Sequence, residues 1–349
     1  MTVTLLDCTL RDGSYAVDFQ FTAKFTAEYC RVVNDLGFKY VEVGHGMGIG
    51  ASDKIRRAIS SDLEYAESAQ LAKTHSKWGM FAQPAFSSIS EISKLCEVGM
   101  DFVRVGIDIN EAEQGLKYVE QLKQFQIEIF VNLMKSYTVD PKTMYSIMER
   151  FVELGVTGVY LVDSAGGMTR SDVEEYASEL LVLSNRTKVG FHGHDNLGLA
   201  ISNSLFLAEI GFDLIDCTMQ GIGRSSGNAS AEKLLALLNR CGYESSIDLI
   251  KLLKAGENLI RPKLPVAGHS GLDTFAGYAL FHTSYMENLL KVSRDLGVDP
   301  YALMQEHCLT NLSSGSVEDF IPSGRKLVQD GILLDAPLPI DKYVGNEQG

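Results

Sequence analysis

The sequence predicts a (β/α)8 (TIM) barrel followed by a small helical region at the C-terminal end. Eight short runs rich in Val, Ile, Leu and Phe recur in the first two thirds of the 349 residues. The stretches that follow these runs show helical periodicity. The runs start 24 to 39 residues apart, which is enough for a strand, a helix and two loops.

A repeated βα unit places successive strands parallel to one another, and eight such units close into a barrel. A doubly wound open sheet is the alternative, but it usually needs fewer strands, and no G-x-G-x-x-G sequence follows the first run. We therefore expect strands at 3–7, 39–43, 78–82, 102–106, 127–133, 157–163, 188–192 and 213–218.

Glycines mark the ends of three expected helices, because glycine adopts the left-handed conformation that often follows a helix. These helices span 22–36, 87–98 and 141–154. Ser171 and Glu174 have the spacing of a capping box at the start of a further helix. The glycine-rich stretch 46–52 is expected to be a loop.

The βα rhythm fades after Leu238. We expect an amphipathic helix at 246–259, a long helix at 275–302 that is broken near Gly297, and short helices in 301–334. Residues 335–349 look extended. The chain is therefore predicted to consist of a barrel domain, residues 1–265, and a C-terminal helical region, residues 266–349, packed against it.

Composition narrows the function classes. A formal net charge of -14 opposes binding to nucleic acid or to anionic membranes. No apolar run reaches the roughly 20 residues needed to cross a bilayer, and the first residues show no basic region or cleavage signal, so we expect a cytoplasmic protein. The six cysteines form no C-x-x-C pair and are expected to be free thiols.

A candidate metal site lies at the ends of the first and seventh strands. His192 and His194 are separated by one residue, so their side chains project the same way from a strand. With Asp12 they form a set of two nitrogens and one carboxylate that suits Mn²⁺, Mg²⁺, Co²⁺ or Zn²⁺. Asn228 could add its amide oxygen. Asp12 taken alone would more often be a turn or N-cap carboxylate than a metal ligand, and the three residues together favour the metal.

Other polar residues follow strands at the end where a barrel places its active site. Arg11 could hold a carboxylate or stabilise an enolate oxygen, or could form a salt bridge at the rim. His45 could touch substrate or be structural. Arg224 lies in a Gly/Ser loop that could cradle an anion or be a flexible turn.

Six motifs occur in order along the chain: Leu10-Arg11-Asp12-Gly13-Ser14, Glu42 to Gly46, Val103 to Val105, Asp163 to Gly166, His192 to Leu197 and Gly221 to Ala229. Together they resemble the motifs of the DRE-TIM metallolyases, most closely those of the 4-hydroxy-2-oxovalerate aldolases. The resemblance spans nearly the whole chain. The related condensing enzymes of the isopropylmalate synthase type continue the first motif with Glu-Gln, whereas this chain continues with Ser14-Tyr15.

The resemblance implies a divalent metal, most often Mn²⁺, on Asp12, His192 and His194. It implies retro-aldol cleavage of a 4-hydroxy-2-oxo acid to an aldehyde and pyruvate enolate, with Arg11 and the metal stabilising the enolate. It also implies an acylating aldehyde dehydrogenase as partner, or a homo-oligomer. From the same motifs we expect substrate contacts by His45, Arg104, Ser164 and Asn228.

Two departures from the aldolase pattern concern proton transfer. Tyr15 stands where the aldolases usually carry a general-base histidine, and His282 stands where they carry a tyrosine. A Tyr15/His282 pair can still transfer protons, because histidine titrates near neutrality and tyrosine serves as a hydrogen-bond donor. We therefore predict Arg11, Tyr15 and His282 as the catalytic residues. Asp195 stands where the aldolases often have another histidine.

Three hypotheses follow from the sequence. The first is a class II pyruvate aldolase that cleaves or forms a C–C bond between pyruvate and an aldehyde. The second is a Claisen-type enzyme that condenses an acyl-CoA with a 2-oxo acid, against which the missing Glu-Gln counts. The third is a barrel that binds metal and a partner without turnover, as a scaffold or regulatory subunit.

Overall fold

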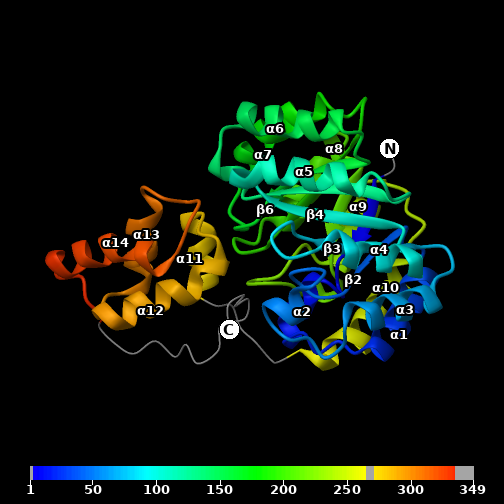
Figure 1. The fold of residues 1–349 in the computed structure, drawn as a ribbon, viewed down its shortest axis with the longest axis horizontal. Helices are drawn as coiled ribbons and strands as arrows, with labels where there is room; N and C mark the ends of the chain where they lie inside the picture. Colours follow the sequence, from blue (N-terminus) through cyan, green and yellow to red (C-terminus); the bar gives the residue numbers. More distant parts are fainter. Residues whose placement is uncertain (1–2, 265–270, 335–349) are drawn as a thin grey trace.

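The computed structural model describes residues 3–264 and 271–334. Eight parallel strands form a closed barrel in chain order, and β8 pairs with β1 from Thr4 opposite Leu214 to Asp7 opposite Cys217 (Figure 1). The predicted fold class is confirmed. The strands are β1 (Thr4–Asp7), β2 (Tyr40–Val43), β3 (Lys77–Ala82), β4 (Phe102–Asp108), β5 (Glu128–Met134), β6 (Gly158–Asp163), β7 (Lys188–Gly193) and β8 (Leu214–Cys217).

The helices that follow the strands cover the outside of the barrel, and their apolar faces build the main core against it. Thr22, Ser88 and Asp140 cap three of these helices by accepting from backbone N–H groups. They are α1 (Ala23–Leu36), α2 (Ala51–Lys54), α3 (Asp62–Ala72), α4 (Ile89–Val98), α5 (Ala112–Leu122), α6 (Pro141–Glu153), α7 (Arg170–Leu181), α8 (Ala200–Ile210), α9 (Ala231–Arg240) and α10 (Leu249–Ala255).

Two predicted helix starts are wrong. The capping box of α7 is formed by Thr169 and Asp172, not by Ser171 and Glu174, because the chain is already helical at Arg170. The helix expected from residue 246 begins at Leu249, because Asp248 caps it by accepting from the N–H groups of Ile250 and Lys251. Beyond Ala255 that helix widens into a π-turn, Gly256–Ile260.

The C-terminal region contains α11 (Gly271–Ala279), α12 (Met286–Leu296), α13 (Pro300–Cys308) and α14 (Val317–Asp330). The break expected near Gly297 is confirmed, with φ of 67° at that residue. A second break was not predicted: Leu280 has φ of 56°, and His282 is extended. The long helix expected from 275 is therefore interrupted, and His282 lies in the connection rather than in a helix.

The C-terminal helices have their own apolar core, centred on residues such as Phe281, Met286 and Phe320. They lie beside the barrel (Figure 1). Gly277 of α11 contacts Gly167 of the barrel. A Cβ on Gly167 would lie 2.2 Å from the carbonyl oxygen of Gly277, so no larger residue fits at position 167. Gly167 belongs to the loop after β6, so α11 contacts the end of the barrel where the strands finish.

The division into residues 1–265 and 266–349 stays a prediction. Its boundary and the extended segment predicted for 335–349 lie outside the described residues. No helix within 3–264 or 271–334 is long and apolar enough to cross a membrane.

Candidate active site

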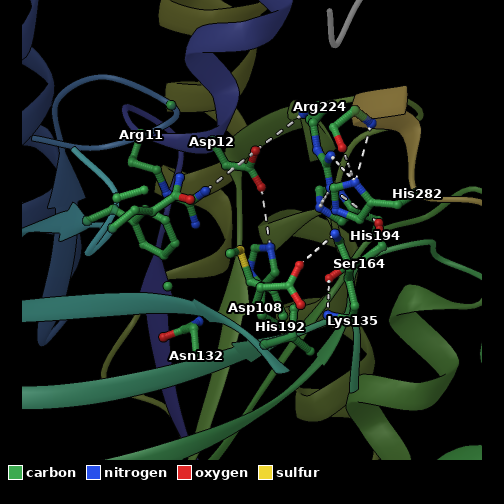
Figure 2. A pocket seen from close by; sticks show the side chains of 18 of the residues that line it. Arg11, Asp12, Asp108, Asn132, Lys135, Ser164, His192, His194, Arg224 and His282 are labelled. Carbon is green, nitrogen blue, oxygen red and sulfur yellow. Dashed lines mark hydrogen bonds and ion pairs between the residues drawn. The ribbon is translucent and has the colours of Figure 1, made fainter. Parts of the chain in front are cut away.

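A cavity of about 210 Å³ opens at the carboxyl ends of the barrel strands. Most of its wall comes from loops after β1, β3, β4, β5, β7 and β8, and His282 and Ser284 of the C-terminal region complete it (Figure 2). Of the predicted site residues, seven lie in this wall: Arg11, Asp12, Tyr15, Ser164, His192, His194 and His282. Three do not: His45, Arg104 and Asn228.

The three predicted metal ligands converge at one side of the cavity. Asp12 opens the 3₁₀ turn η1 (Asp12–Val17) after β1, His192 lies in β7, and His194 follows it. The Oδ2 of Asp12 lies 3.4 Å from the Nε2 of His192, and all three ligand atoms lie within 4.8 Å of one another. All three side chains are buried. The geometry thus brings together one carboxylate and two imidazoles, as the sequence predicted.

Each histidine is oriented through its other ring nitrogen. The Nδ1 of His192 lies 2.8 Å from the Oδ2 of Asp216, and the Nδ1 of His194 lies 3.2 Å from the carbonyl oxygen of Gly227. A carbonyl can only accept, so Nδ1 of His194 carries the hydrogen and Nε2 presents its lone pair to the cavity. Such a carbonyl or carboxylate partner is typical of metal-binding histidines.

Electrostatics favour the ligand forms of two of these side chains. Burial lowers the pKa of His194 to about 3, which keeps its imidazole neutral. Burial alone would raise the pKa of Asp12, but the neighbouring Arg11 and His192 hold it well below its usual range, so Asp12 is ionised. A neutral imidazole and a carboxylate are the states that bind a cation.

Asn228 tests whether the residues fit a cation. Its Nδ2 donates to the Oδ2 of Asp12 at 2.9 Å and to the carbonyl oxygen of Ile222 at 3.2 Å. This fixes the amide, and its Oδ1 is buried without a hydrogen-bond partner among the described residues. An amide oxygen beside Asp12 is a suitable further ligand or a partner of a metal-bound group. The donor set therefore fits a divalent metal.

A second group, Cys8, His192 and Asp216, also has its ligand atoms within 4.8 Å. The guanidinium of Arg104 contacts both Cys8, at 3.2 Å, and Asp216. Cys8 and Asp216 do not line the cavity, whereas Asp12, His192 and His194 all do. The set around Asp12 is therefore the candidate metal centre.

Contacts with Glu42 and Phe81 hold the side chain of Arg11 in the cavity wall. Its Nε donates to the Oε2 of Glu42 at 2.8 Å, and its guanidinium lies 4.8 Å from the centre of the Phe81 ring. The same Glu42 oxygen accepts from Arg104 Nη1 at 3.0 Å, and Arg104 also bonds Asp216. A buried chain of alternating charges thus links Arg11 to His192. Arg104 lies beneath the cavity in this chain, so the structure does not support its predicted substrate contact.

His45 is likewise outside the cavity wall. Its Nδ1 accepts from the N–H of Met47 at 3.1 Å, its Nε2 lies 2.8 Å from the carbonyl oxygen of Arg56, and its ring stacks on Phe19 at 4.2 Å. Burial lowers its pKa to about 4. Both nitrogens are used within the loop after β2, so the structural alternative is the one the geometry supports.

Tyr15 and His282 enter the cavity from different parts of the chain. Tyr15 lies in η1, and His282 precedes the 3₁₀ turn η7 (Thr283–Tyr285). The Nδ1 of His282 lies 2.6 Å from the Oγ of Ser284, and its Nε2 lies 3.2 Å from Nη2 of Arg224. Burial and the adjacent Arg224 hold the pKa of His282 well below its usual value, so the ring is neutral.

Arg224 bridges the two sides of the site. Its Nη2 lies 3.4 Å from the Nε2 of His194 and donates to the carbonyl oxygen of Ser164 at 3.3 Å. The side chain is buried in the cavity wall. The flexible-turn alternative for Arg224 is therefore not supported, whereas a positive charge facing the cavity is.

The sequence assigned no role to one charged pair in the wall. The Nζ of Lys135, just beyond β5, donates to the Oδ2 of Asp108 at 2.6 Å, and it also contacts the hydroxyl of Tyr285 (Figure 2). Asp108 was missed because β4 was predicted to end at 106, whereas it continues through Ile107 to Asp108. The alternation of inward residues along this strand is the signal that could have found it.

The closed barrel, with an aspartate and two histidines together at the carboxyl ends of its strands, places the protein among the (β/α)8 barrels that have a candidate metal centre at this end. The model of one family, HMGL-like, matches residues 2–259. The chain belongs to this family.

Relatives with names span nearly the same length. A 4-hydroxy-2-oxovalerate aldolase of Carboxydothermus hydrogenoformans is 32% identical over 324 residues, 91% of this chain and 95% of the relative. One of Thermus thermophilus is 31% identical over 304 residues, 86% and 88% of the two chains. An oxaloacetate decarboxylase of Mycobacterium tuberculosis is 35% identical over 257 residues, 73% and 75% of the two chains.

Solved structures share the fold. The carboxyl transferase domain of Rhizobium etli pyruvate carboxylase superimposes with a TM-score of 0.75 at 14% identity, covering 94% of this chain and 61% of that one. The HMG-CoA lyase of Bacillus subtilis gives a TM-score of 0.65 at 18% identity, covering 76% and 95%. At these identities the likeness concerns the barrel and its topology alone.

Proposed function

We propose that the protein is a divalent-metal-dependent pyruvate aldolase that cleaves a 4-hydroxy-2-oxo acid, or runs in the condensing direction. The observation that carries the proposal is the convergence of Asp12, His192 and His194 beside Arg11 in one cavity. The names of relatives that match about nine tenths of the chain support it.

Asp12, His192 and His194 would hold the metal, with Mn²⁺ as our first choice. A divalent cation in this place supplies Lewis-acid polarisation of the 2-oxo group and neutralises developing negative charge. Asn228 lies beside the ligands with a buried amide oxygen for the same purpose.

Arg11 stabilises the enolate. The Nε of Arg11 donates to Glu42, and its Nη1 lies 3.7 Å from the Oδ1 of Asp12. The remaining N–H groups of the guanidinium therefore lie next to the metal ligands. As the C3–C4 bond breaks, its electron pair moves towards the 2-oxo oxygen, and these N–H groups donate to that oxygen. Because Glu42 and Phe81 fix the guanidinium in advance, little reorganisation is needed.

His282 accepts the proton of the 4-hydroxyl group as that carbon becomes the aldehyde. Its imidazole is neutral. Arg224 can only donate, so Nε2 of His282 carries the lone pair, and Nδ1 bonds the Oγ of Ser284. Tyr15 serves as hydrogen-bond donor and gives a proton to C3 of the enolate to form pyruvate; it takes a proton back from water, and His282 releases its proton to water. The placement of both residues in the cavity wall supports these roles.

The purified protein with Mn²⁺ should release pyruvate from a 4-hydroxy-2-oxo acid such as 4-hydroxy-2-oxovalerate, measured with a coupled lactate dehydrogenase. Arg11→Ala should lower kcat by about 10²- to 10³-fold, the usual effect of losing one oxyanion donor. Arg150→Ala, which removes an exposed ion pair with Glu113, is the matched control and should retain the rate. A protein that binds Mn²⁺ but forms no pyruvate from a broad panel would refute the proposal.

Decarboxylation of oxaloacetate is a second candidate, favoured by the 35% identical relative that bears this name. It yields the same pyruvate enolate by loss of CO₂ and needs no base for a 4-hydroxyl group. His282→Ala separates the two, since it should abolish aldol cleavage and spare decarboxylation. Equal losses of both activities would contradict the role given to His282.

The other hypotheses keep their own tests. A Claisen-type enzyme would release free CoA thiol from acetyl-CoA and a 2-oxo acid. A scaffold would bind metal and a partner without turnover. We also infer an acylating aldehyde dehydrogenase or a second copy of the chain as partner, which co-purification and the oligomeric mass in solution would test.

A further inference from the structure

The wall of the cavity opposite the metal ligands is polar and charged. In a barrel of eight strands in sequence order, β4 lies across from β8 and β5 across from β1. Asp108 ends β4, and Lys135 follows β5. Both therefore face the cavity from the side away from Asp12, and a substrate whose 2-oxo group lies at Asp12 extends its other end towards them.

The charged pair in this wall is held rigidly. The Oδ1 of Asp108 accepts from the backbone and side chain of Asn110, both at 3.0 Å, while its Oδ2 accepts from Lys135. Lys135 adopts a left-handed backbone conformation, φ 59°, and its N–H donates to the Oγ of Ser164 at 3.0 Å. Such a conformation is unfavourable for lysine and is found mostly at functional sites.

Three further polar side chains extend this wall. Glu111 follows Asp108 in the turn η2 (Ile109–Glu111), Gln83 follows β3, and Ser284 comes from the C-terminal region. The Oγ of Ser284 lies close to His282, the proposed base. This wall therefore offers both hydrogen-bond donors and acceptors in addition to His282.

We propose that the aldehyde half of the substrate is neutral and hydroxylated, such as glycolaldehyde or glyceraldehyde, rather than an alkyl aldehyde. This rests on the proposed aldolase function. A hydroxyl group both donates to the Oδ2 of Asp108 and accepts from Lys135 in place of its longest contact, 3.5 Å to the carbonyl oxygen of Ser313, whereas an alkyl chain returns no hydrogen bond to either group. At this pair the carboxylates of Asp108 and Glu111 outnumber the ammonium group of Lys135, while Arg224 contacts His282 and the carbonyl oxygen of Ser164, so an anionic group is disfavoured beside Asp108.

The chemistry of the cleaved bond is unchanged. The C3–C4 bond breaks, its electron pair goes to the enolate, and the proton of the 4-hydroxyl goes to His282. A hydroxyl on C5 takes no part and only binds Asp108 and Lys135. The substrates are therefore 4,5-dihydroxy-2-oxo acids, which a sugar-acid dehydration would supply.

The decisive experiment compares glycolaldehyde with propanal in the condensation with pyruvate and Mn²⁺, because these aldehydes differ by a hydroxyl in place of a methyl group. We expect kcat/KM to be at least about 100-fold higher for glycolaldehyde, as for sites built to bond a substrate hydroxyl. Lys135→Met and Asp108→Ala should each lower this preference by about tenfold or more. Both aldehydes are measured on the same sample, so partial unfolding cancels from the ratio.

Lys77→Met is the matched control. It removes an ion pair between the Nζ of Lys77 and the Oε1 of Glu128, 2.8 Å apart. These residues begin β3 and β5, at the end of the barrel away from the cavity, so the aldehyde preference should stay unchanged. A preference for propanal, or for the anionic succinic semialdehyde, would overturn the proposal, and so would a ratio unaffected in both wall variants. If no aldehyde reacts and no 4-hydroxy-2-oxo acid yields pyruvate, the aldolase function itself fails.

Discussion

The two ends of the barrel interior are filled very differently. Near the amino ends of the strands, aromatic rings pack edge to face, with Tyr40, Phe102 and Phe130 separated by 5.5 to 5.8 Å. Two residues further along the same strands, the inward side chains are charged or polar: Glu42, Arg104, Asn132, His192 and Asp216.

The difference shows how one set of strands divides its work. Residues two apart in a strand face the same side, so β2, β4 and β5 each contribute a packing residue and then a polar one. Burying the charged layer is unfavourable unless every charge is paired, and Arg104 provides the pairing for both Glu42 and Asp216. The aromatic layer stabilises the barrel, and the layer above it positions the site.

The largest expected effect comes from the metal ligands. His194→Ala should lower kcat/KM by about a thousandfold or more, since a metal supplies several kcal/mol of charge stabilisation. Mn²⁺ affinity, measured by electron paramagnetic resonance titration, should fall with it. His75→Ala, an exposed histidine, is the control. Unchanged Mn²⁺ affinity in the His194 variant would remove this residue from the metal centre.

Removing the charge that pairs the polar layer should affect both stability and the site. Arg104→Met leaves Asp216 buried without its arginine and Glu42 buried with Arg11 as its remaining arginine partner, which should cost about 3–5 kcal/mol of unfolding free energy. The loss of orientation at His192 should also weaken Mn²⁺ binding by about 10- to 100-fold. Denaturant unfolding and metal titration measure the two effects. A variant that loses stability but keeps full Mn²⁺ affinity would show that Arg104 does not orient His192 for metal binding.

A change in the aromatic layer should affect stability alone. Phe130→Ala removes a fully buried ring and should cost about 3–5 kcal/mol. The kcat/KM of the remaining folded fraction should stay within about twofold of the native value. Steady-state kinetics well below the unfolding midpoint test this, and a large loss in kcat/KM would contradict the division between the layers.

The smallest effect concerns a charge outside both layers. Burial raises the pKa of Asp7 to about 7, above its ordinary value of 3.8. The folded state therefore binds more protons than the unfolded state between these values, and stability falls as pH rises from about 4 to 7. One such group gives a slope of at most about 1.36 kcal/mol per pH unit. Asp7→Asn should flatten the profile of unfolding free energy, and an unchanged slope would contradict the assignment.

Most of the barrel could be predicted, because strands buried on both faces give continuous apolar runs and glycines mark helix ends. The metal ligands were also predictable, since His192 and His194 follow an apolar run and Asp12 has the same place after the first one. All three positions depend on local spacing and on the parallel arrangement alone.

Other parts of the site depend on tertiary contacts that no local pattern contains. Both nitrogens of His45 bind its own loop, and Arg104 points into the barrel beneath the cavity rather than into it. The interruption at Leu280 and His282 lies within a helical pattern, and the ring of Phe281 there packs against Phe320 of α14, a contact that no local pattern contains. Asp108, the partner of Lys135, was missed because β4 extends two residues beyond its predicted end.

The glycine contact between Gly167 and Gly277 has a consequence for how such enzymes diversify. The metal ligands and Arg11 all belong to the barrel, whereas the proposed base and Ser284 arrive on one short connection carried by a separately packed group of helices. Exchange of that connection alone would change the proposed proton acceptor, while the metal ligands, Arg11 and the Asp108–Lys135 pair of the barrel stay in place. The C-terminal helices can therefore change the proton transfer at the site independently of the barrel.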